Sequence, residues 1–409
     1  MPIVIYMLGL AVFAQGTSEF MLSGLIPEIA DDLGVSVPAA GTLTSAFAAG
    51  MIVGAPLTAV LSLRWPRRRA LLVFLVVFTL VHVAGAVTTD FGVLLATRVV
   101  AALANAGFLA VGLATAADLA GPAAKGRATA VLLGGVTLAC VAGVPAGAVL
   151  GQAWGWRSAF WAVAAVSVPA VFAILRSVPA APADAAAPGA RRELRALRRP
   201  RLLVTLSLAA LVNGATFCAF TYLAPLVTDV GGFGPGWVPV FLALFGLGSF
   251  AGVTAGGRMS DERPARLLVP GGVALLGGWS LLMATADEAA WAFALVFVQG
   301  ALSFAVGSTL ITRVLYEAVE APSLGGAFAT AALNVGAAAG PVLGGAAIGA
   351  GLGYRSPLGA SALLVALAFV TAGAAWAVRR LRAGGGSPGR DDSGDLRGLR
   401  ARQGGESPS

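Results

Sequence analysis

The chain carries FAAGMIVGAPLTAVLSLRWP at residues 47–66 and FGLGSFAGVTAGGRMSDERP at residues 245–264, which is 198 positions further on. The two stretches share a phenylalanine, two glycines spaced by four and a closing proline in one register: Phe47/Phe245, Gly50/Gly248, Gly54/Gly252 and Pro66/Pro264. Pro27 and Pro225 extend this register outward across another span. Matches at proline and at paired glycines in one register are rarer by chance than matches at alanine. The sequence therefore predicts a duplicated unit.

Composition indicates that this duplicated unit lies in a membrane. Of 409 residues, 58% are hydrophobic and 11% are charged, whereas soluble chains have about 45–50% apolar and about 25% charged residues. Too little polar material remains to cover a water-facing surface, so the surface has to face lipid. Cys140 and Cys218 each lie inside an apolar run, so we expect neither a disulfide nor a metal site.

Apolar runs long enough to cross a bilayer, which takes about 20 residues, recur along the whole chain. The first half has Ile3–Ile26, Ala39–Leu63, Ala70–Thr88, Gly92–Ala117, Ala128–Leu150 and Ser158–Leu175. The second half has Leu202–Val227, Gly236–Gly256, Ala265–Ala284, Ala290–Leu315, Gly326–Gly349 and Pro357–Val378. We therefore expect an all-α integral membrane protein with 12 transmembrane helices, in two six-helix halves related by internal repeats.

The same pass along the chain divides it into four parts. We expect an N-terminal half at residues 1–175, a cytoplasmic linker at 176–201, a C-terminal half at 202–382 and a disordered cytoplasmic tail at 383–409. The linker is rich in Ala and Pro and then basic, whereas the tail consists largely of Gly, Ser, Pro and mixed charge. Such polar segments of low hydrophobicity do not bury a core.

Basic residues gather in alternate loops: Arg64, Arg67, Arg68, Arg69, Lys125, Arg127, Arg258, Arg263, Arg266 and Arg313. The opposite loops hold Arg157 and Arg355 beside several acids. By the positive-inside rule both termini are cytoplasmic, in a multi-pass protein of the cell (plasma) membrane. The net charge of +8 then comes from basic residues that set the orientation in the membrane. These residues interact with the anionic headgroups of the lipid bilayer, and no nucleic-acid partner is expected.

Glu19 is the most informative single residue. It lies well inside the first apolar run, where a charge is costly and acids are functional by default. We expect it to face a cavity and to couple proton movement to transport. A structural acid that hydrogen-bonds near the headgroups is the alternative.

Arg98 is the base deepest in a span. Because arginine does not lose its proton in practice, Arg98 needs a carboxylate, a carbonyl or water beside it. It is either a charge partner that couples to a nearby acid or a packing residue that extends toward the cytoplasmic face. The residues alone do not separate these two roles.

Weaker candidates are polar, aromatic or helix-bending residues at membrane depth. Gly143, Pro145 and Gly147 allow close packing and bending of the fifth span. Candidate substrate-lining residues are Phe20, Asn105, Asn213, Phe217, Tyr222 and Asn334. The three amides either line the cavity or simply bond a neighbouring helix, and the residues alone do not separate these roles. The lone histidine, His82, is interpreted as a tolerated core residue.

Motifs for soluble enzymes are missing from the sequence. It contains no His-Glu-x-x-His, no phosphate-binding G-x-x-x-x-G-K and no Cys-x-x-Cys. We expect no catalytic residue, no cofactor site and no metal site. Uphill transport would then use an ion gradient.

Four sequence segments resemble the twelve-span drug/proton antiporters of the major facilitator superfamily. Residues 61–68, LSLRWPRR, lie where that superfamily carries its cytoplasmic gating motif, with Leu63 in place of the usual acid. Residues 257–261, GRMSD, form the second copy and keep the acid. Arg98 matches the fourth-span arginine, and residues 143–147, GVPAG, match the fifth-span antiporter motif. The resemblance implies gating residues at Arg64, Arg67, Arg68, Asp261 and Arg266, and it implies export.

Other stretches are similar to actinobacterial chloramphenicol-resistance exporters: residues 16–22, 98–108, 298–304 and 331–336. This likeness implies a proton-coupled exporter of chloramphenicol or related small neutral aromatic compounds, with protons and drug as partners and with no cofactor or obligate protein partner. A carrier that takes up or exchanges a small metabolite on the same fold is the first alternative. A membrane-embedded enzyme and a passive channel are less favoured by the residues.

Overall fold

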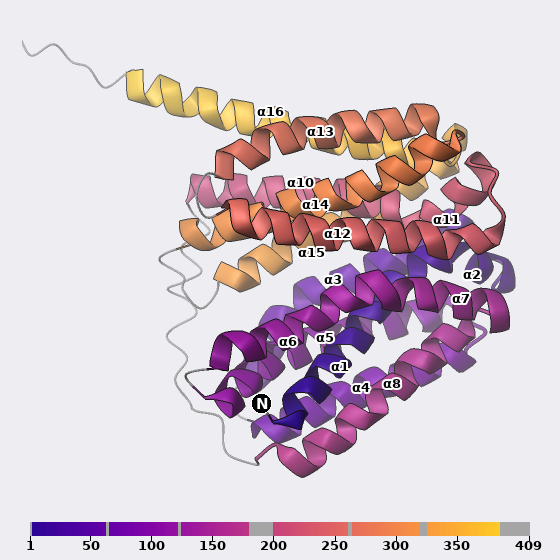
Figure 1. Ribbon diagram of the computed structural model, residues 1–409, viewed down its shortest axis with the longest axis vertical. Helices are drawn as coiled ribbons and strands as arrows, with labels where there is room; N and C mark the ends of the chain where they lie inside the picture. The colour runs from indigo at the N-terminus through magenta and orange to yellow at the C-terminus, as the bar shows by residue number, and fades with distance from the viewer. Residues whose placement is uncertain are drawn as a thin grey trace, which may run out of the picture.

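The computed structural model describes residues 2–62, 65–121, 124–179, 199–260, 264–318 and 325–384. Within these ranges twelve helical spans are long and apolar enough to cross a membrane. They pack side by side into one elongated bundle (Figure 1). The predicted all-α membrane fold is confirmed, and the predicted runs overlap all of these spans.

The first half contributes six spans. They comprise α1 (Ile3–Phe20) with the 3-10 turn Met21–Gly24, α3 (Val37–Ser62), α4 (Arg67–Val87), α5 (Phe91–Ala120), α6 (Lys125–Leu138) continued by α7 (Val144–Trp154), and α8 (Arg157–Ser177). The short α2 (Ile26–Asp32) follows the first span. A π-helical turn, Ala139–Gly143, joins α6 to α7.

The second half repeats this order. Its elements are α10 (Pro200–Thr221) with α11 (Leu223–Pro225), α12 (Val238–Ser260), α13 (Pro264–Thr285), α14 (Ala289–Glu317), α15 (Gly325–Ala347) and α16 (Ser356–Gly384). The offset of 198 holds at helix ends: α5 begins at Phe91 and α14 at Ala289, while α3 ends at Ser62 and α12 at Ser260. The repeat seen in two short stretches therefore extends over the membrane-spanning part of both halves.

Small residues let the second and fourth spans of each half approach closely. A Cβ added at Gly54 of α3 would lie 3.0 Å from the Cβ of Ala106 in α5. In the second half, Gly248 and Gly252 of α12 lie against the backbone carbonyls of Phe297 and Ala301 in α14. Larger side chains would separate these helices, as expected for small-residue packing in membranes.

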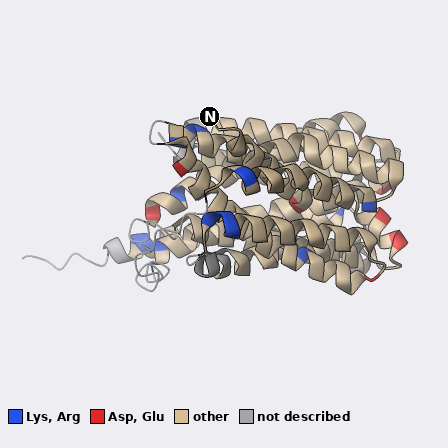
Figure 2. Cartoon of the chain, turned by 90° about the horizontal axis from the view of Figure 1, so that it is seen from below, with Lys and Arg blue, Asp and Glu red and all other residues tan. Residues whose placement is uncertain are grey.

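Charge differs between the two ends of the bundle (Figure 2). We call the end with Arg67, Lys125 and Arg313 the basic end, and the end with Asp32, Asp229 and Asp287 the acidic end. Most Lys and Arg residues gather at the basic end, and many Asp and Glu residues gather at the acidic end. This distribution follows the alternation of loops found in the sequence.

The two halves contact each other from the acidic end to the middle of the bundle. The Gln152 amide donates to the Pro235 carbonyl at 2.7 Å. The Tyr222 ring fills the space beside Gly41 and Gly345, on α3 and α15. In Figure 1 the halves lie closest near α2, α7 and α11 and diverge toward the end marked N.

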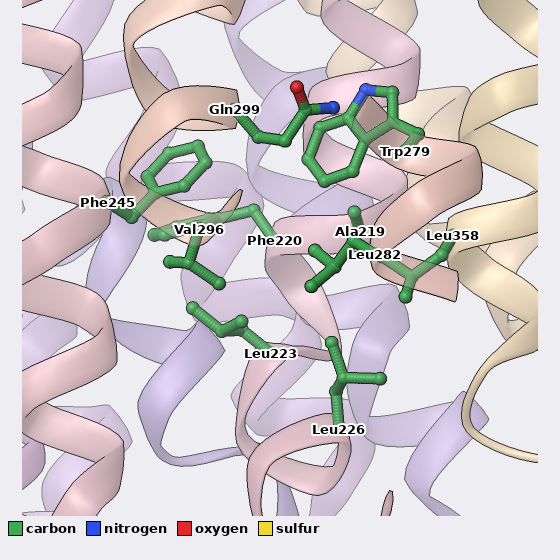
Figure 3. A pocket seen from close by; sticks show the side chains of 10 residues that line it. All are labelled: Ala219, Phe220, Leu223, Leu226, Phe245, Trp279, Leu282, Val296, Gln299 and Leu358. Carbon is green, nitrogen blue, oxygen red and sulfur yellow. The ribbon is translucent and has the colours of Figure 1, made fainter. Parts of the chain in front are cut away.

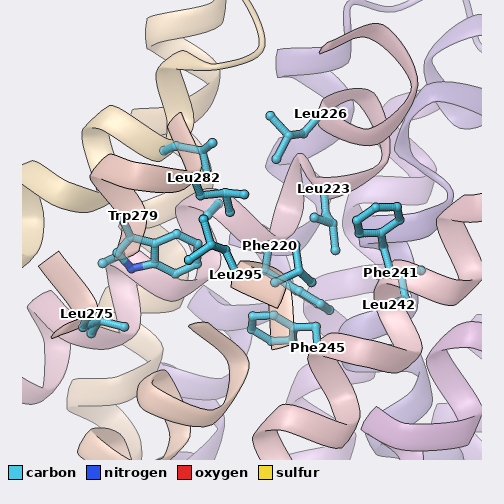
Figure 4. Packing of buried hydrophobic residues seen from close by; sticks show 14 of the residues in the cluster. Phe220, Leu223, Leu226, Phe241, Leu242, Phe245, Leu275, Trp279, Leu282 and Leu295 are labelled. Atoms are coloured by element: carbon cyan, nitrogen blue, oxygen red, sulfur yellow. The ribbon is translucent and has the colours of Figure 1, made fainter. Parts of the chain in front are cut away.

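The second half encloses an apolar core, shown in Figure 4. It is built from aromatic and leucine side chains of α10, α12, α13 and α14, among them Phe220, Phe241, Phe245 and Trp279. Aromatic residues bury large areas and prefer tilted or edge-to-face pairs. Phe220 and Phe245 form such a pair, with centroids 4.6 Å apart, and they bring this core up to the interface between the halves.

Candidate functional site

Arg98 is buried between α1, α3 and α5, with a side-chain exposure of 1%. One guanidinium nitrogen donates to the hydroxyl of Ser18 at 2.8 Å, and the other donates to the Ser18 backbone carbonyl at 2.7 Å. The guanidinium carbon lies 4.6 Å from the ring centroid of Phe47, in a cation–π contact. Arg98 is thus held by a neighbouring helix rather than extending to the membrane surface.

His82 of α4 completes this network. Its Nε2 lies 2.6 Å from the Ser18 hydroxyl and its Nδ1 lies 2.7 Å from the Phe78 carbonyl. A carbonyl only accepts, so Nδ1 carries a proton; in the neutral ring Nε2 then accepts from Ser18. The Ser18 hydroxyl therefore accepts from Arg98 and donates to His82. The sequence interpretation of His82 as a tolerated core residue left out this role in the polar network.

Glu19 follows Ser18 on α1 and is partly exposed. Its charge and that of Arg98 are near enough to attract each other, but among the described residues the Glu19 carboxylate forms no ion pair or hydrogen bond. Its role as the proton-coupling acid stays a prediction. Protonation would leave the Arg98 charge without its opposing carboxylate, because Ser18 supplies only neutral partners.

Several buried polar atoms near this network lack hydrogen-bond partners within the described part of the chain. They include both amide atoms of Gln15, one turn before Glu19, and Nε of Arg98. Most buried polar groups in proteins are hydrogen-bonded, so each exception calls for an explanation. Among the described residues, unpartnered atoms also occur in the second half, at Trp279, Gln299 and Ser303, so they are not confined to the surroundings of the embedded acid and base.

An aromatic cavity of about 10 Å³ lies where the halves meet. Five phenylalanines line it together with Cys140, Thr216, Gly246 and Ser249: Phe20, Phe217, Phe220, Phe245 and Phe304. The Phe20 ring of the first half lies 5.7 Å from Phe217 and 6.4 Å from Phe220 of the second half, between centroids. None of the lining side chains is charged.

A second cavity of about 10 Å³ lies deeper in the second half (Figure 3). Phe220 and Phe245 line both cavities. Gln299 and Trp279 lie side by side at one edge of it, and its other lining residues are apolar (Figure 3). Two small cavities thus flank the same aromatic pair.

The remaining candidate lining residues contact neighbouring backbone or side chains. The Asn213 amide donates to the Leu333 carbonyl at 2.7 Å, and that of Asn334 donates to the Thr330 carbonyl at 2.9 Å. The Asn105 amide lies 3.6 Å from the sulfur of Met51. The Tyr222 hydroxyl donates to Pro341 at 2.7 Å, near the acidic end. Of the six candidates, the structure brings Phe20 and Phe217 together at the aromatic cavity, and the roles of all six stay predictions.

The predicted gating residues are described in part. Arg67 forms an ion pair with Asp118, which joins the start of α4 to the end of α5 at the basic end. The Arg68 side chain is partly exposed nearby. Arg64 and Asp261 lie outside the described residues, and of Arg266 only the backbone in α13 is described.

The predicted hinge of the fifth span coincides with an irregular helix. The π-helical turn ends at Gly143, and Pro145 follows in the first turn of α7. Proline has no N–H to continue α-helical bonding, and π-helical turns are frequent where helices bend or function. Gly143 faces the Thr17 side chain and Gly147 faces Met21, so the segment packs against the first span.

Sequence reasoning missed three members of the network around Arg98, namely Ser18, His82 and Phe47, and it missed Asp118, the partner of Arg67 at the basic end. Ser18 acts partly through its backbone carbonyl, which no side-chain pattern reveals. His82 and Phe47 lie on separate helices, and only the fold brings His82 to Ser18 and Phe47 to Arg98. Among the described residues no group of three or more His, Cys, Asp or Glu side chains could hold a metal ion.

Comparison with known proteins identifies the family to which this fold belongs. The profile of the Major Facilitator Superfamily matches residues 8–331. The chain belongs to the Major Facilitator Superfamily. Within this superfamily it is 60% identical over 375 residues to the chloramphenicol resistance protein of Streptomyces lividans, covering 91% of this chain and 96% of the relative. It is 37% identical over 349 residues to the inner membrane transport protein YdhP of Escherichia coli K12, covering 85% and 89%.

A solved structure shares the fold. The crystal structure of a bacterial homolog of the human lysosomal transporter Spinster superposes with a TM-score of 0.74, at 16% identity, over 90% of this chain and 95% of that chain. This superfamily protein is therefore a multi-pass membrane transporter of a small-molecule substrate, with the fold that the sequence predicts.

Proposed function

We propose that this protein exports chloramphenicol or related small neutral aromatic compounds in exchange for protons, and so gives resistance to the antibiotic. The observation that carries the proposal is the 60% identity, over nearly the whole chain, to a relative named a chloramphenicol resistance protein. At that identity the superfamily and its general transport chemistry are shared. The finer claims concern substrate, coupling and direction.

The aromatic cavity supports a neutral aromatic substrate. Ligand sites are mostly apolar with a few polar groups, and the rings of Phe20, Phe217 and Phe220 offer faces and edges for an aromatic drug. Since no charged side chain lines the cavity, a cation would lose its hydration without gaining a carboxylate there. A volume of about 10 Å³ is far below the roughly 300 Å³ of a small ligand pocket, so drug entry requires the halves to separate at this level.

In the proposed cycle Glu19 takes up a proton from the outside and loses its attraction for Arg98. The loss of this charge pair biases the halves, residues 1–175 and 202–382, toward opening on the cytoplasmic side. Drug binding at the aromatic cavity then favours proton release to the cytoplasm and the return movement. We place the basic end and both termini in the cytoplasm, with the linker at 176–201 and the tail at 383–409 on the same side of the cell membrane.

The proton gradient is the proposed energy source, so transport needs no cofactor. We propose no enzymatic activity, no nucleic-acid partner and no obligate protein partner. Glu19 and Arg98 act on transport by charge and position rather than by bond-breaking chemistry.

Expression in a drug-sensitive host tests the proposal. We expect raised chloramphenicol tolerance and lowered drug accumulation, with both effects abolished by a protonophore. If tolerance and drug accumulation are unchanged at normal expression, chloramphenicol is not the substrate. Export that persists after the gradient is collapsed would refute the coupling.

A further inference from the structure

A groove of about 880 Å³ opens between α10, α14 and α16, near the basic end of the second half. Its volume lies in the roughly 300–1,000 Å³ range of ligand pockets. It shares no lining residue with the aromatic cavity between the halves. It is therefore a separate site, and the transport cycle described above makes no use of it.

Three arginines and one acid line the groove: Arg201, Arg313, Arg379 and Glu317. The acid is already engaged, because Glu317 accepts from Nε of Arg313 at 3.1 Å and from the Thr205 hydroxyl at 2.7 Å. Within the described residues neither Arg201 nor Arg379 forms an ion pair. The groove thus holds two positive charges in excess of its acid.

The rest of the lining is largely apolar and faces outward. Val204 and Leu208 of α10 form one wall, while Val370 and Val378 of α16 form the other and are exposed on the bundle surface. Arg201 lies in the first turn of α10 and Glu317 ends α14, so the charged part lies at the level where spans leave the bilayer. The groove therefore has positive charge at the membrane surface and apolar walls below it. An amphiphile with an anionic headgroup and hydrocarbon chains is complementary to both parts.

We propose that this groove binds an anionic phospholipid such as phosphatidylglycerol. Its phosphate would lie against Arg201 and Arg379, and its acyl chains would lie along α10 and α16. Guanidinium groups bind phosphate oxygens with paired hydrogen bonds, and basic pockets between membrane helices select anionic headgroups. A phosphatidylcholine headgroup brings its own ammonium, which the excess positive charge disfavours.

The test uses the full chain purified in detergent micelles without drug, so its outcome does not depend on the exported substrate. Native mass spectrometry measures how much phosphatidylglycerol or phosphatidylcholine stays bound at equal added concentration. We expect phosphatidylglycerol to be retained at least about fivefold better. In the double variant Arg201→Gln/Arg379→Gln we expect retention to fall about twenty-five-fold, since each arginine near an anionic headgroup contributes about a factor of five.

The matched control is Arg176→Gln/Arg380→Gln. Both arginines are exposed at the basic end, and Arg380 adjoins Arg379 but lies over the Trp376 ring, with 4.0 Å from its guanidinium carbon to the centroid. We expect this control to bind phosphatidylglycerol like the parent, and inorganic phosphate not to displace the lipid. Three results would each overturn the proposal. The parent could retain both lipids equally, the Arg201→Gln/Arg379→Gln variant could retain phosphatidylglycerol fully, or inorganic phosphate could displace the lipid. The lipid comparison on the parent stands even if a variant is unstable.

Discussion

The repeat lets equivalent positions of the two halves be compared directly. At the offset of 198, Glu19 of α1 corresponds to Phe217 of α10, and Arg98 of α5 corresponds to Val296 of α14. One half carries an acid and a base where the other carries a ring and an aliphatic side chain. The same helix scaffold therefore supports a charged site in the first half and an apolar site in the second.

Local partners explain why each half tolerates its own residues. Arg98 has the Ser18 carbonyl and hydroxyl and the Phe47 ring beside it, which compensate a buried charge. Val296 lines the cavity of Figure 3, whose other lining residues are apolar apart from Gln299 and Trp279. Among the described residues no carboxylate lines it, so a buried arginine charge there would be costly. A duplicated fold can thus hold a charged cluster in one copy and an apolar one in the other without changing its helices.

The largest effect is expected where the charged half loses its acid. Glu19→Gln removes the proton-exchanging group and should lower gradient-driven export by on the order of a hundredfold, as when a proton-transferring side chain is lost. Drug binding should persist, because the aromatic cavity is unchanged. Transport in proteoliposomes with an imposed pH gradient measures export, and an equilibrium binding assay measures drug affinity. Together they show whether the variant loses export and keeps drug binding.

Glu28→Gln is the matched control for this acid. Glu28 lies on α2 at the acidic end, and burial raises the pKa of its carboxyl above the ordinary value. Its loss should leave export near the parent level. Equal loss of export in both variants, or full export by Glu19→Gln, would contradict the special role of Glu19.

Ser18→Ala should break the network around Arg98. Arg98 loses one hydrogen-bond acceptor and His82 loses its donor, so we expect the free energy of unfolding to fall by about 1–3 kcal/mol. The equivalent position in the apolar half is Thr216, whose hydroxyl donates to the Val212 carbonyl of its own helix at 3.0 Å. Thr216→Val should cost less than about 1 kcal/mol. Denaturation in micelles measures the free energy of unfolding of both variants. An equal loss in Ser18→Ala and Thr216→Val would contradict the proposed difference between the two halves.

Phe217→Ala should weaken drug binding in the apolar half. Loss of the ring that the drug would contact is expected to raise the drug Kd about two- to twelvefold, the size of one aromatic pair, while the pH gradient still drives transport. Phe293→Ala is the control, because its ring stacks on Phe241 at 4.6 Å and does not line the aromatic cavity. Equilibrium binding of labelled chloramphenicol distinguishes them. A normal Kd for Phe217→Ala would locate the drug elsewhere.

The smallest effect concerns an ion pair at the acidic end. Arg157 donates to Asp32 at 2.5 Å, and this hydrogen bond holds the pKa of Asp32 below its ordinary value. The pair therefore stabilises the fold above the unfolded pKa of about 3.9, and this contribution is lost as the pH falls toward the lowered folded pKa. Arg157→Gln should cost about 0.2–1 kcal/mol at pH 6 through this pair. At low pH only the loss of its contacts with the Thr88 carbonyl and the Trp156 ring should remain.

The equivalent residue in the second half, Arg355, pairs with Asp287 at 3.1 Å, and that carboxylate is more exposed than Asp32. Arg355→Gln should therefore cost less than Arg157→Gln at pH 6. Thermal unfolding over a pH series measures both variants. A cost for Arg157→Gln that stays constant from pH 6 to pH 3 would exclude the Asp32 pair as its source.

Helix positions and the duplication could be predicted from sequence, because apolar length and loop charge are local properties. The predicted runs at Gly92–Ala117 and Ala290–Leu315 overlap α5 and α14 almost entirely. Glu19 and Arg98 could be singled out for a related reason, since any charge inside an apolar run needs an explanation.

The partners of those charges could not be predicted. Arg98 is held by a backbone carbonyl and by groups from α1 and α3, which are distant in sequence. The aromatic cavity likewise needs Phe20 of one half and Phe245 of the other to meet. Phenylalanines are frequent in apolar spans, so composition does not indicate which of them face a neighbouring half.

The contact between His82 and Ser18 also offers an internal reporter. The chain contains one histidine, so labelling histidine with nitrogen-15 gives a single imidazole spectrum without any introduced probe. Both ring nitrogens are engaged, one by Phe78 and one by Ser18. A proton or drug that shifts Arg98 away from Ser18 would change the Nε2 resonance while Nδ1 stays bound to its own helix. The resting and loaded states of the transporter would then be distinguishable by magnetic resonance in an unmodified membrane protein.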